Sequence, residues 1–573
     1  MMRRSFVRYA VHYSGQPEPG GVNRFPVFPV LLAQPLLLIA ALWLVACDKG
    51  AAAQRGLEDQ ALSATANTPT SGGALLFAFD GAAITQFELD PHKSGFAPHH
   101  RVIRSIFDSL VVALPNHTFG PWLAKSWELS PDGLSYTFKL REDVHFHDGS
   151  RFDAKAVQYN LERIKDPKNA FFWASDLGPY EGCDVLDEFS VRVRFREPYA
   201  PFLANLSKSS LAMVSPAAAA KHGAQFPLHP VGSGPFVFKS LQAGTEIVLT
   251  RNDDYRWPPV NAAHQGPAYL QQVTFKNVPE EATRVAVLLN GQAGVADLIP
   301  AQNLLSFRSA KDFHLVQGEL LNHNYALYLN TQRAPWTDPR IREAFRRSLE
   351  IDAAVKMVYL GTTARAFSPL SPSLLGYDPA LEGAYPGDPA AAARTLDELG
   401  FKKGADGVRV RDGQRLSLVF LDTQGNREKR LDVLTVLRRQ LRASGFEVRI
   451  DTQPQGAYLQ KVAASDYDLL GGSLFAPDPD VLRRIHSPLL RSAASVSKTD
   501  DPELNRLLDD GAHELLPQKR VEIYKQAQRL ILERTYAIPI YVLIYNVAAS
   551  NKVHGISIDT HGFPTLYDTW VDT

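Results

Sequence analysis

Cysteine is nearly missing from this chain of 573 residues, which contains only Cys47 and Cys183. A disulfide framework or a zinc-dependent fold needs more thiols, so both are excluded as the basis of the structure. A surplus of either charge is missing as well, because Lys and Arg together number 61 and so do Asp and Glu. Proteins that bind nucleic acid usually carry a basic surplus, and we therefore expect no nucleic-acid partner.

The motifs of common catalytic and nucleotide-binding sites are also missing. The sequence has no Walker A loop, no G-x-G-x-x-G, no C-x-x-C and no G-x-S-x-G. The run at His513 begins like H-E-x-x-H, but Pro517 stands where the second histidine belongs. We therefore predict no catalytic residue, no enzyme activity and no cofactor.

Two groups of histidines, His99-His100 and His145-Phe146-His147, could ligate a metal. No cluster of carboxylates accompanies either group in the sequence, and metal centres usually combine several ligand types. We expect these histidines to lie on the surface and predict no metal site.

Long hydrophobic runs are scarce, but Leu36 to Ala46 forms an apolar stretch of eleven residues, LLLIAALWLVA. A membrane-spanning helix needs about 20 such residues. A stretch of this length, preceded by the positive charge of Arg24, is typical of the central region of a signal peptide. The alternative is a simple membrane anchor from about Phe25 to Ala46, although prolines interrupt that longer segment.

The next residues, Leu44-Val45-Ala46-Cys47, resemble the lipobox of bacterial lipoproteins. The resemblance implies cleavage before Cys47, acylation of its thiol and a periplasmic protein anchored to the cell membrane. Residues 1–46 are then the signal peptide. Residues 47–72, rich in Ala, Ser, Thr and Gly, are predicted to be a flexible tether. With Cys47 lipidated, Cys183 has no disulfide partner and is expected in the core.

Strand and helix signals alternate through the rest of the chain. The apolar run 74–79 predicts a buried strand, and the alternation in 135–140 predicts a half-buried one. Helices are predicted after three Asp-Pro pairs, in which the aspartate caps the helix and the proline takes its first position; the pairs begin at Asp338, Asp388 and Asp501. The first of these helices is expected to cover 341–359. The pattern indicates a mixed α/β fold.

Residues 121–164 resemble family 5 of the bacterial solute-binding proteins, which includes receptors for dipeptides, oligopeptides and nickel chelates. The matching residues are Leu123, Ala124, Trp127, Asp132, Gly133, Tyr136, Phe138, Leu140, Phe146, His147, Asp148 and Gly149. Further blocks follow in the family's order at 230–236, 251–255, 328–331, 338–344, 424–426 and 478–480. The resemblance covers residues 73 to 545, and it makes His147 a structural residue of the family.

The resemblance implies two α/β lobes around a cleft, with a smaller third domain inserted in the first lobe. The expected boundaries are 73–105, 199–283 and 535–573 for the first lobe, 106–198 for the inserted domain and 284–534 for the second lobe. It further implies a monomeric receptor of an ABC importer, which closes over a peptide or peptide-like solute and docks on a permease with separate ATPase subunits. An exported hydrolase, or a ligand sensor or chaperone on the same fold, is the alternative.

The expected ligand site departs from that of the dipeptide receptors. In the dipeptide receptors, an aspartate binds the amino group of the peptide; the corresponding position here is Phe475, three residues before Asp478. An arginine of those receptors binds the peptide carboxylate, and Gln424 falls near the corresponding position. Phe475 offers an apolar surface and cannot pair with an ammonium. We therefore expect a longer or modified peptide, an opine-like compound or a metal chelate. Alternatively, Asp478 or Asp80 anchors the amine, and Phe79 beside Asp80 is a further candidate contact.

Overall fold

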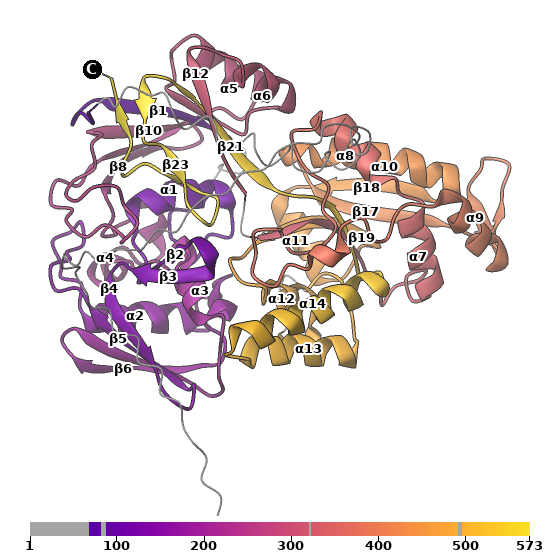
Figure 1. Cartoon of the computed structure of the whole chain (residues 1–573), viewed down its shortest axis with the longest axis horizontal. Coiled ribbons are helices and arrows are strands. Elements are labelled where there is room, and N and C mark those ends of the chain that lie inside the picture. Colours follow the sequence, from indigo (N-terminus) through magenta and orange to yellow (C-terminus); the bar gives the residue numbers. More distant parts are fainter. Residues whose placement is uncertain (1–67, 82–87, 320–321, 491–494, 573) are drawn as a thin grey trace, which may run out of the picture. The chain divides into compact units, whose positions relative to one another are not determined.

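The computed structural model of the chain describes residues 68–81, 88–319, 322–490 and 495–572 (Figure 1). The predicted signal peptide, the lipid site at Cys47 and the tether as far as residue 67 lie outside the described residues. Among the helices that are described, none is both long and apolar enough to cross a bilayer. Cys183 is buried, as expected.

A seven-stranded sheet with the order β12-β21-β11-β1-β10-β9-β8 forms the first lobe. Its strands are β1 (Ala74–Phe79), β8 (Phe236–Gln242), β9 (Glu246–Arg251), β10 (Gln272–Asn277), β11 (Val295–Asp297), β12 (Phe313–Glu319) and β21 (Ile544–Ser550). The predicted buried strand over 74–79 is confirmed as β1, which runs parallel to both of its neighbours. Phe77 and Phe79 point to one core and Ala78 to another, which explains why nearly the whole strand is apolar.

Helices cover both faces of this sheet (Figure 1). Helix α1 (Ala97–Ile106) packs on the face of Phe77, and α5 (Glu281–Leu289) and α6 (Ala301–Phe307) pack on the face of Ala78. The C-terminal segment adds two short hairpins to the first lobe, β22 (Val553–His554) with β25 (Trp570–Val571), and β23 (Ser557–Ile558) with β24 (Pro564–Thr565).

The inserted domain is built on a four-stranded antiparallel sheet. Its elements are β4 (Ala124–Leu129), β5 (Ser135–Leu140), β7 (Ser190–Phe195), β6 (Tyr180–Asp187), the covering helix α2 (Ala154–Lys165) and the hairpin of β2 (Val111–Leu114) with β3 (Thr118–Pro121). Two short helices, α3 (Phe202–Leu206) and α4 (Pro216–His222), follow the sheet. The outward arginines of β7 form a solvated face, on which Arg194 pairs with Glu181 and Asp184.

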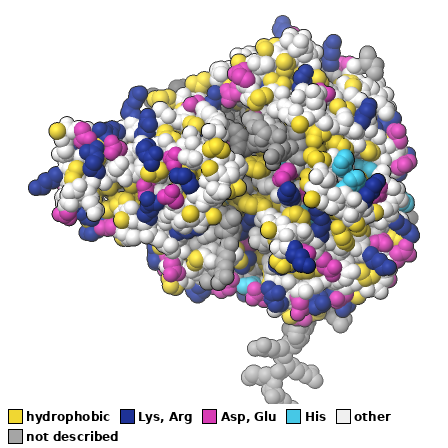
Figure 2. Space-filling view, turned by 180° about the vertical axis from the view of Figure 1, so that it is seen from behind, with side chains coloured by type: hydrophobic (Ala, Val, Ile, Leu, Met, Phe, Trp, Pro, Cys, Tyr) yellow, Lys and Arg dark blue, Asp and Glu magenta, His cyan; other side chains and the backbone are white. Residues whose placement is uncertain are grey.

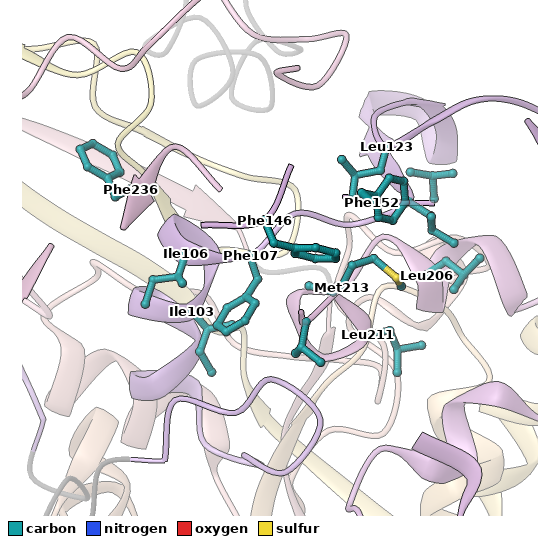
Figure 3. Packing of buried hydrophobic residues seen from close by; sticks show 14 of the residues in the cluster. Ile103, Ile106, Phe107, Leu123, Phe146, Phe152, Leu206, Leu211, Met213 and Phe236 are labelled. Carbon is teal, nitrogen blue, oxygen red and sulfur yellow. The ribbon is translucent and has the colours of Figure 1, made fainter. Parts of the chain in front are cut away.

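A continuous apolar core joins the inserted domain to the first lobe. Ile103, Ile106 and Phe107, at the end of α1, face Phe146 and other core side chains in Figure 3. His147 strengthens this junction, because its Nε2 donates to the carbonyl of Gly234 at 2.9 Å. The predicted structural role of His147 is therefore consistent with its contacts.

The second lobe has a five-stranded mixed sheet with the order β18-β17-β19-β13-β20. Its strands are β13 (Asn322–Leu329), β17 (Ser417–Thr423), β18 (Glu447–Gln453), β19 (Leu469–Phe475) and β20 (Ala537–Tyr541). A small sheet of β14 (Lys402–Lys403), β15 (Arg409–Arg411) and β16 (Gln414–Arg415) comes directly before β17 in the chain. The helices of this lobe are α7 (Pro339–Arg347), α8 (Ile351–Tyr359), α9 (Pro389–Glu398), α10 (Arg430–Ser444), α11 (Gln455–Ala463), α12 (Val481–His486), α13 (Pro502–His513) and α14 (Pro517–Glu533).

The sheets cross the predicted lobe boundaries in two places. Strands β11 and β12 follow residue 284, yet they belong to the sheet of the first lobe. Strand β20 follows residue 535, yet it pairs with β13 in the second lobe. The chain thus passes between the two sheets after β12 and returns between Tyr541 and Ile544. Strand pairing, which joins segments far apart in sequence, decides these memberships.

Two further expectations need correction. The helix expected over 341–359 is divided into α7, which ends at Arg347, and α8, which begins at Ile351, because Glu350 between them has a non-helical backbone with φ −97° and ψ 75°. The histidines expected on the surface, His99 and His100, are buried, with exposed fractions of 2% and 1%. Both sit on α1. The two ring nitrogens of His100 bond to Ser209 and to the carbonyl of Ser94, so hydrogen bonds replace water around that ring. His99 bonds to Ser94 through Nδ1, and its buried Nε2 has no hydrogen-bond partner among the described residues.

Candidate ligand-binding cleft

A cavity of about 280 Å³ lies between the two lobes. The first lobe and the inserted domain contribute the start of α1, Trp173 and the turn 561–563. The second lobe contributes residues from β13, β17 and β19 and from the starts of α10 and α11. The carboxyl ends of β17 and β19 meet at this edge, which is where open α/β sheets usually bind ligands.

One wall of the cavity is aromatic. Phe475, the last residue of β19, lies 4.9 Å from Phe563 and 5.5 Å from His561 between ring centroids, in edge-to-face arrangements. Trp173 lines the same cavity and donates its indole N–H to the carbonyl of Ser94 at 2.5 Å. The first lobe and the second lobe therefore share one apolar surface, on which a flat or aliphatic part of a solute can pack.

The first lobe presents a buried guanidinium to the cavity. Arg101 on α1 contacts the carboxylate of Asp297 at 2.7 Å, and Tyr545 donates to the same carboxylate at 3.0 Å. Burial is the largest influence and lowers the pKa of Arg101, but Asp297 and further neighbours, among them Tyr545 and Asp80, together outweigh it, and the pKa is raised. Nε and Nη2 of Arg101 make no hydrogen bond with any described residue, so this cation keeps donors for a ligand.

The second lobe presents another buried guanidinium. Arg430, the first residue of α10, donates its Nε to Asp422 at 2.9 Å and its Nη2 to the hydroxyl of Thr423. Burial again lowers the pKa of Arg430 and the neighbouring carboxylate of Asp422 raises it, with a net rise. Nη1 of Arg430 has no hydrogen-bond partner among the described residues. Both lobes therefore offer a charged donor that remains protonated.

A group of tyrosines lies beside these charges. Tyr325 and Tyr541 stack with ring centroids 4.7 Å apart and an interplanar angle of 11°. The hydroxyl of Tyr325 lies against Gly471, where a side chain would approach it to 2.0 Å. This hydroxyl is buried, and within the described part of the chain it has no hydrogen-bond partner. An unsatisfied buried polar group is costly, and one that lines a cavity is typical of a ligand contact.

Glu428 stands between this cavity and a second one of about 420 Å³. Its carboxylate is exposed, accepts from the hydroxyl of Tyr541 at 3.4 Å and forms no ion pair with the described residues. Glu428 and Lys429 have φ angles of 60° and 59°, and such left-handed backbone is costly for residues other than glycine. Lys429 pairs with Glu281 of α5 at 2.7 Å, which ties this segment to the first lobe.

The histidines that line the cavity are neutral. Burial lowers the pKa of His100 to about 3, and the hydrogen bond from its ring to the carbonyl of Ser94 offsets only part of this effect. Burial also lowers the pKa of His561. Among the described residues, no group of three or more His, Cys, Asp or Glu side chains is arranged to hold a metal ion.

The sequence-derived site residues are distributed over several places. Phe475 lines the cavity between the lobes, and Asp80 lines the second cavity. Phe79 is fully buried in the core of the first lobe, and the side chain of Gln424 is exposed and lines neither cavity. Asp478 is buried in the second lobe, where both of its oxygens accept from Arg520.

Sequence reasoning missed most of the polar residues of the cleft. These are Arg101, Tyr325, Asp422, Glu428 and Arg430. Asp422 and Arg430 flank the block 424–426, so the turn between a strand and a helix was a usable signal. Arg101 and Tyr325 carried no signal, because their contacts depend on long-range strand pairing and on lobe packing.

Comparison with known proteins places these features in a family. The model of bacterial extracellular solute-binding proteins, family 5 Middle, matches residues 118–489. The glutathione-binding protein GsiB of Salmonella paratyphi A is 27% identical over 487 residues, which are 82% of this chain and 90% of that protein. GsiB of Escherichia coli is 26% identical over 490 residues, with the same shares.

Solved structures show the same fold. The oligopeptide-binding protein AppA of Bacillus subtilis, in complex with a nonapeptide, has a TM-score of 0.76 at 20% identity, covering 88% of this chain and 100% of that one. NikA of Brucella suis, in complex with Fe(III)-EDTA, has a TM-score of 0.75 at 23% identity, covering 87% and 100%. DppA of Helicobacter pylori, in complex with the peptide STSA, has a TM-score of 0.74 at 23% identity, covering 88% and 99%.

Proposed function

The chain belongs to family 5 of the bacterial extracellular solute-binding proteins, and on this premise we propose that its cleft captures a small, carboxylate-bearing peptide or peptide-like solute for an ABC importer. The observation that carries the proposal is the pair of half-satisfied guanidiniums, Arg101 and Arg430, which line one cavity from opposite lobes. Guanidinium donors bind carboxylates through strong, charge-assisted hydrogen bonds.

Capture and release follow from the position of these donors. A solute carboxylate that is held by Arg430 in the second lobe reaches Arg101 only when the first lobe is close. The aromatic wall of Trp173 and Phe475 excludes water from the rest of the solute, which strengthens the polar contacts. Binding energy is thereby coupled to closure of the lobes, and the closed receptor docks on the permease. The solute leaves chemically unchanged.

Several features favour a peptide-like acid over other solutes. The cavity combines apolar walls with a few charged groups, which is typical of sites for small organic ligands. The GsiB proteins, whose name assigns them glutathione, are similar over most of this chain. Acidic and basic side chains are intermingled on the face shown in Figure 2, as on a protein whose specificity lies in its cleft rather than in a surface of one charge.

We further propose that residues 1–46 direct export, that Cys47 is lipidated and that the receptor works as a monomer on the outer face of the cell membrane. The support is the sequence Leu44-Val45-Ala46-Cys47 after an apolar run. Metabolic labelling with palmitate tests the anchor. Label is expected in the wild type and not in Cys47→Ser, and equal label in both would contradict it.

Titration calorimetry with a panel of glutathione, dipeptides, tripeptides and the derivatives of each in which every free carboxylate is amidated tests the ligand class. Acids are expected to bind at least about tenfold more tightly than their amides, since one charge-assisted hydrogen bond contributes about 1.5–3 kcal/mol. Arg430→Gln should remove this preference. Arg415→Gln is the matched control, because Arg415 is exposed and pairs with Asp406 in the small sheet. Equal binding of acids and amides by the wild type would contradict the proposal.

A further inference from the structure

Glu428 lines the cavity between the lobes and, within the described part of the chain, has no cation within ion-pair distance of its carboxylate. The other acid of the cavity wall, Asp422, is paired with Arg430, and Asp297 behind the wall is paired with Arg101. Glu428 itself is exposed. Arg101 and Arg430 each have an aspartate as counter-charge and keep further N–H donors for a ligand, so the carboxylate of Glu428 is open to the cationic group of that ligand.

The surroundings of Glu428 also suit a cation. Its Oε2 accepts a hydrogen bond from Tyr541, and its backbone carbonyl accepts one from Tyr359. The rings of Tyr325 and Tyr541 are stacked, and those of Tyr359 and Tyr541 lie 5.1 Å apart. Aromatic faces attract ammonium groups, and the unpartnered hydroxyl of Tyr325 can accept a hydrogen bond from one.

The two guanidiniums lie within electrostatic reach of Glu428. Burial has the largest effect on the pKa of both Arg101 and Arg430 and lowers it, and the aspartate paired with each arginine raises it. Glu428 is a further, smaller influence that raises the pKa of both arginines. Arg430 begins α10 two residues after Glu428, and both residues line the same cavity as Arg101, so anionic and cationic partners for a ligand are available side by side in the chain.

The backbone fixes the position of Glu428. The left-handed conformations of Glu428 and Lys429 place two adjacent residues under strain, and strain of this kind is concentrated at functional sites. Lys429 bonds to Glu281 of the first lobe, while Leu431 donates its N–H to Asn426 at 2.8 Å and so fixes the start of α10. The segment is thus held from both lobes.

We propose that Glu428 receives the ammonium of the solute while Arg430 and Arg101 receive the adjacent carboxylate, so that the cleft selects a terminal amino-acid head group. This proposal rests on the proposed function and names its substrate class. A γ-glutamyl peptide has such a head group, with ammonium and carboxylate on one carbon. An ordinary α-peptide carries these groups at opposite ends and cannot present both as one head group.

Three probes with nearly the same atoms test the proposal by titration calorimetry. They are reduced glutathione, its α-linked isomer and its N-acetyl derivative. Wild-type protein is expected to prefer glutathione to both other probes by at least about tenfold. Glu428→Gln should weaken glutathione binding by about ten- to a hundredfold, the range for one charge-assisted hydrogen bond, and should leave the N-acetyl derivative unchanged. Glu428→Asp should keep part of the preference.

Controls separate this proposal from the proposed function. Glu398→Gln, at the exposed end of α9, should bind all three probes like the wild type, and circular dichroism should show unchanged folding for every variant. Tighter binding of all probes by Glu428→Gln would overturn the proposal, because Glu428 would then compete with ligand carboxylates. An equal loss for all probes, or wild-type preference for the α-linked isomer, would also overturn it and leave the receptor function intact. If the wild type bound no peptide acid of the panel, both proposals would fail.

Discussion

Asp478 forms a buried ion pair with Arg520, with distances of 2.7 and 2.6 Å between the paired oxygens and nitrogens. The two side chains are 5% and 4% exposed, and Arg520 also donates to the carbonyl of Gly511 on α13 at 2.7 Å. This pairing gives Asp478 a role in joining β19 to α13 and α14. The alternative that it anchors a ligand amine would require it to leave Arg520 without a counter-charge.

Asp478→Asn is therefore expected to destabilise the protein and to spare ligand binding. Removing one partner of a buried pair costs about 3–5 kcal/mol, because Arg520 stays buried. Urea unfolding measures the loss, and calorimetry on the folded fraction should give an affinity within about twofold of the wild type. A large loss of affinity at unchanged stability would instead support the ligand-anchoring alternative.

Asp108 is a second residue whose contacts set a measurable property. It is fully buried beneath α1 and accepts hydrogen bonds from Ser233, Tyr255 and Trp257. Burial raises the pKa of Asp108 to about 7, although these hydrogen bonds and Arg104 oppose the rise. The unfolded chain loses this proton near pH 4, so the contribution of Asp108 to stability is complete below pH 4 and is lost as the pH rises through 7.

Asp108→Asn should remove this dependence, since asparagine is neutral at every pH. We expect wild type and variant to unfold at similar denaturant concentrations at pH 4. The variant should gain stability relative to the wild type up to pH 7–8, by about 4 kcal/mol at most. The difference between their free energies of unfolding across this range is the measurement, and a constant difference would show that Asp108 is ionised throughout.

Helix starts are the elements that sequence predicted best. The aspartates of the three Asp-Pro pairs are N-caps of α7, α9 and α13, because cap and first-turn proline act within four residues. Their surroundings could not be predicted. Asp388 caps α9 through the N–H of Ala391, whereas Asp501 also accepts from Arg534 and Tyr536 at 2.8 Å each.

Replacing these two caps by alanine should separate local from tertiary contributions. Asp388→Ala is expected to cost about 1 kcal/mol, the usual value of an N-cap. Asp501→Ala should cost about 3 kcal/mol, since it also leaves the partly buried Arg534 and the buried hydroxyl of Tyr536 without their acceptor. Chemical unfolding of both variants gives the comparison. Equal losses would mean that the Arg534 and Tyr536 contacts add nothing to the cap.

At the scale of the whole molecule, the sequence indicated a two-lobed fold. It did not indicate where the chain passes from one lobe to the other, nor which polar residues line the cleft. Local patterns identified β1 and β5, and ordered motif blocks identified the fold. The partners of β11, β12 and β20 are set by strand pairing across the chain. The contacts of Arg101 and Tyr325 follow from that pairing, so nothing near these residues in sequence could reveal them.

A buried charge network holds the lobes together beside the cleft. Arg484 on α12 of the second lobe contacts Asp176 of the inserted domain at 2.6 Å, and Lys208 contacts the other oxygen of Asp176. All three side chains are nearly fully buried, and Lys208 lies 4.0 Å from the centroid of Trp173 in the cleft wall. Opening of the lobes separates Arg484 from Asp176. It leaves the Asp176–Lys208 pair intact, because both residues belong to the part of the molecule formed by the first lobe and the inserted domain.

Arg484→Gln should therefore shift the receptor towards the open state without unfolding either half. Since ligand affinity falls with the population of the binding-competent closed state, we expect a loss of about tenfold in calorimetry, or ~1.4 kcal/mol. Small-angle scattering should show a larger radius of gyration for the variant without ligand, and compaction at saturating ligand.

Arg506→Gln on α13, whose side chain is 63% exposed and pairs only with Asp510 among the described residues, should match the wild type in both measurements. Unchanged affinity and scattering in Arg484→Gln would show that the network does not stabilise closure, because loss of the contact between Arg484 and Asp176 would then have no effect on the distribution of states.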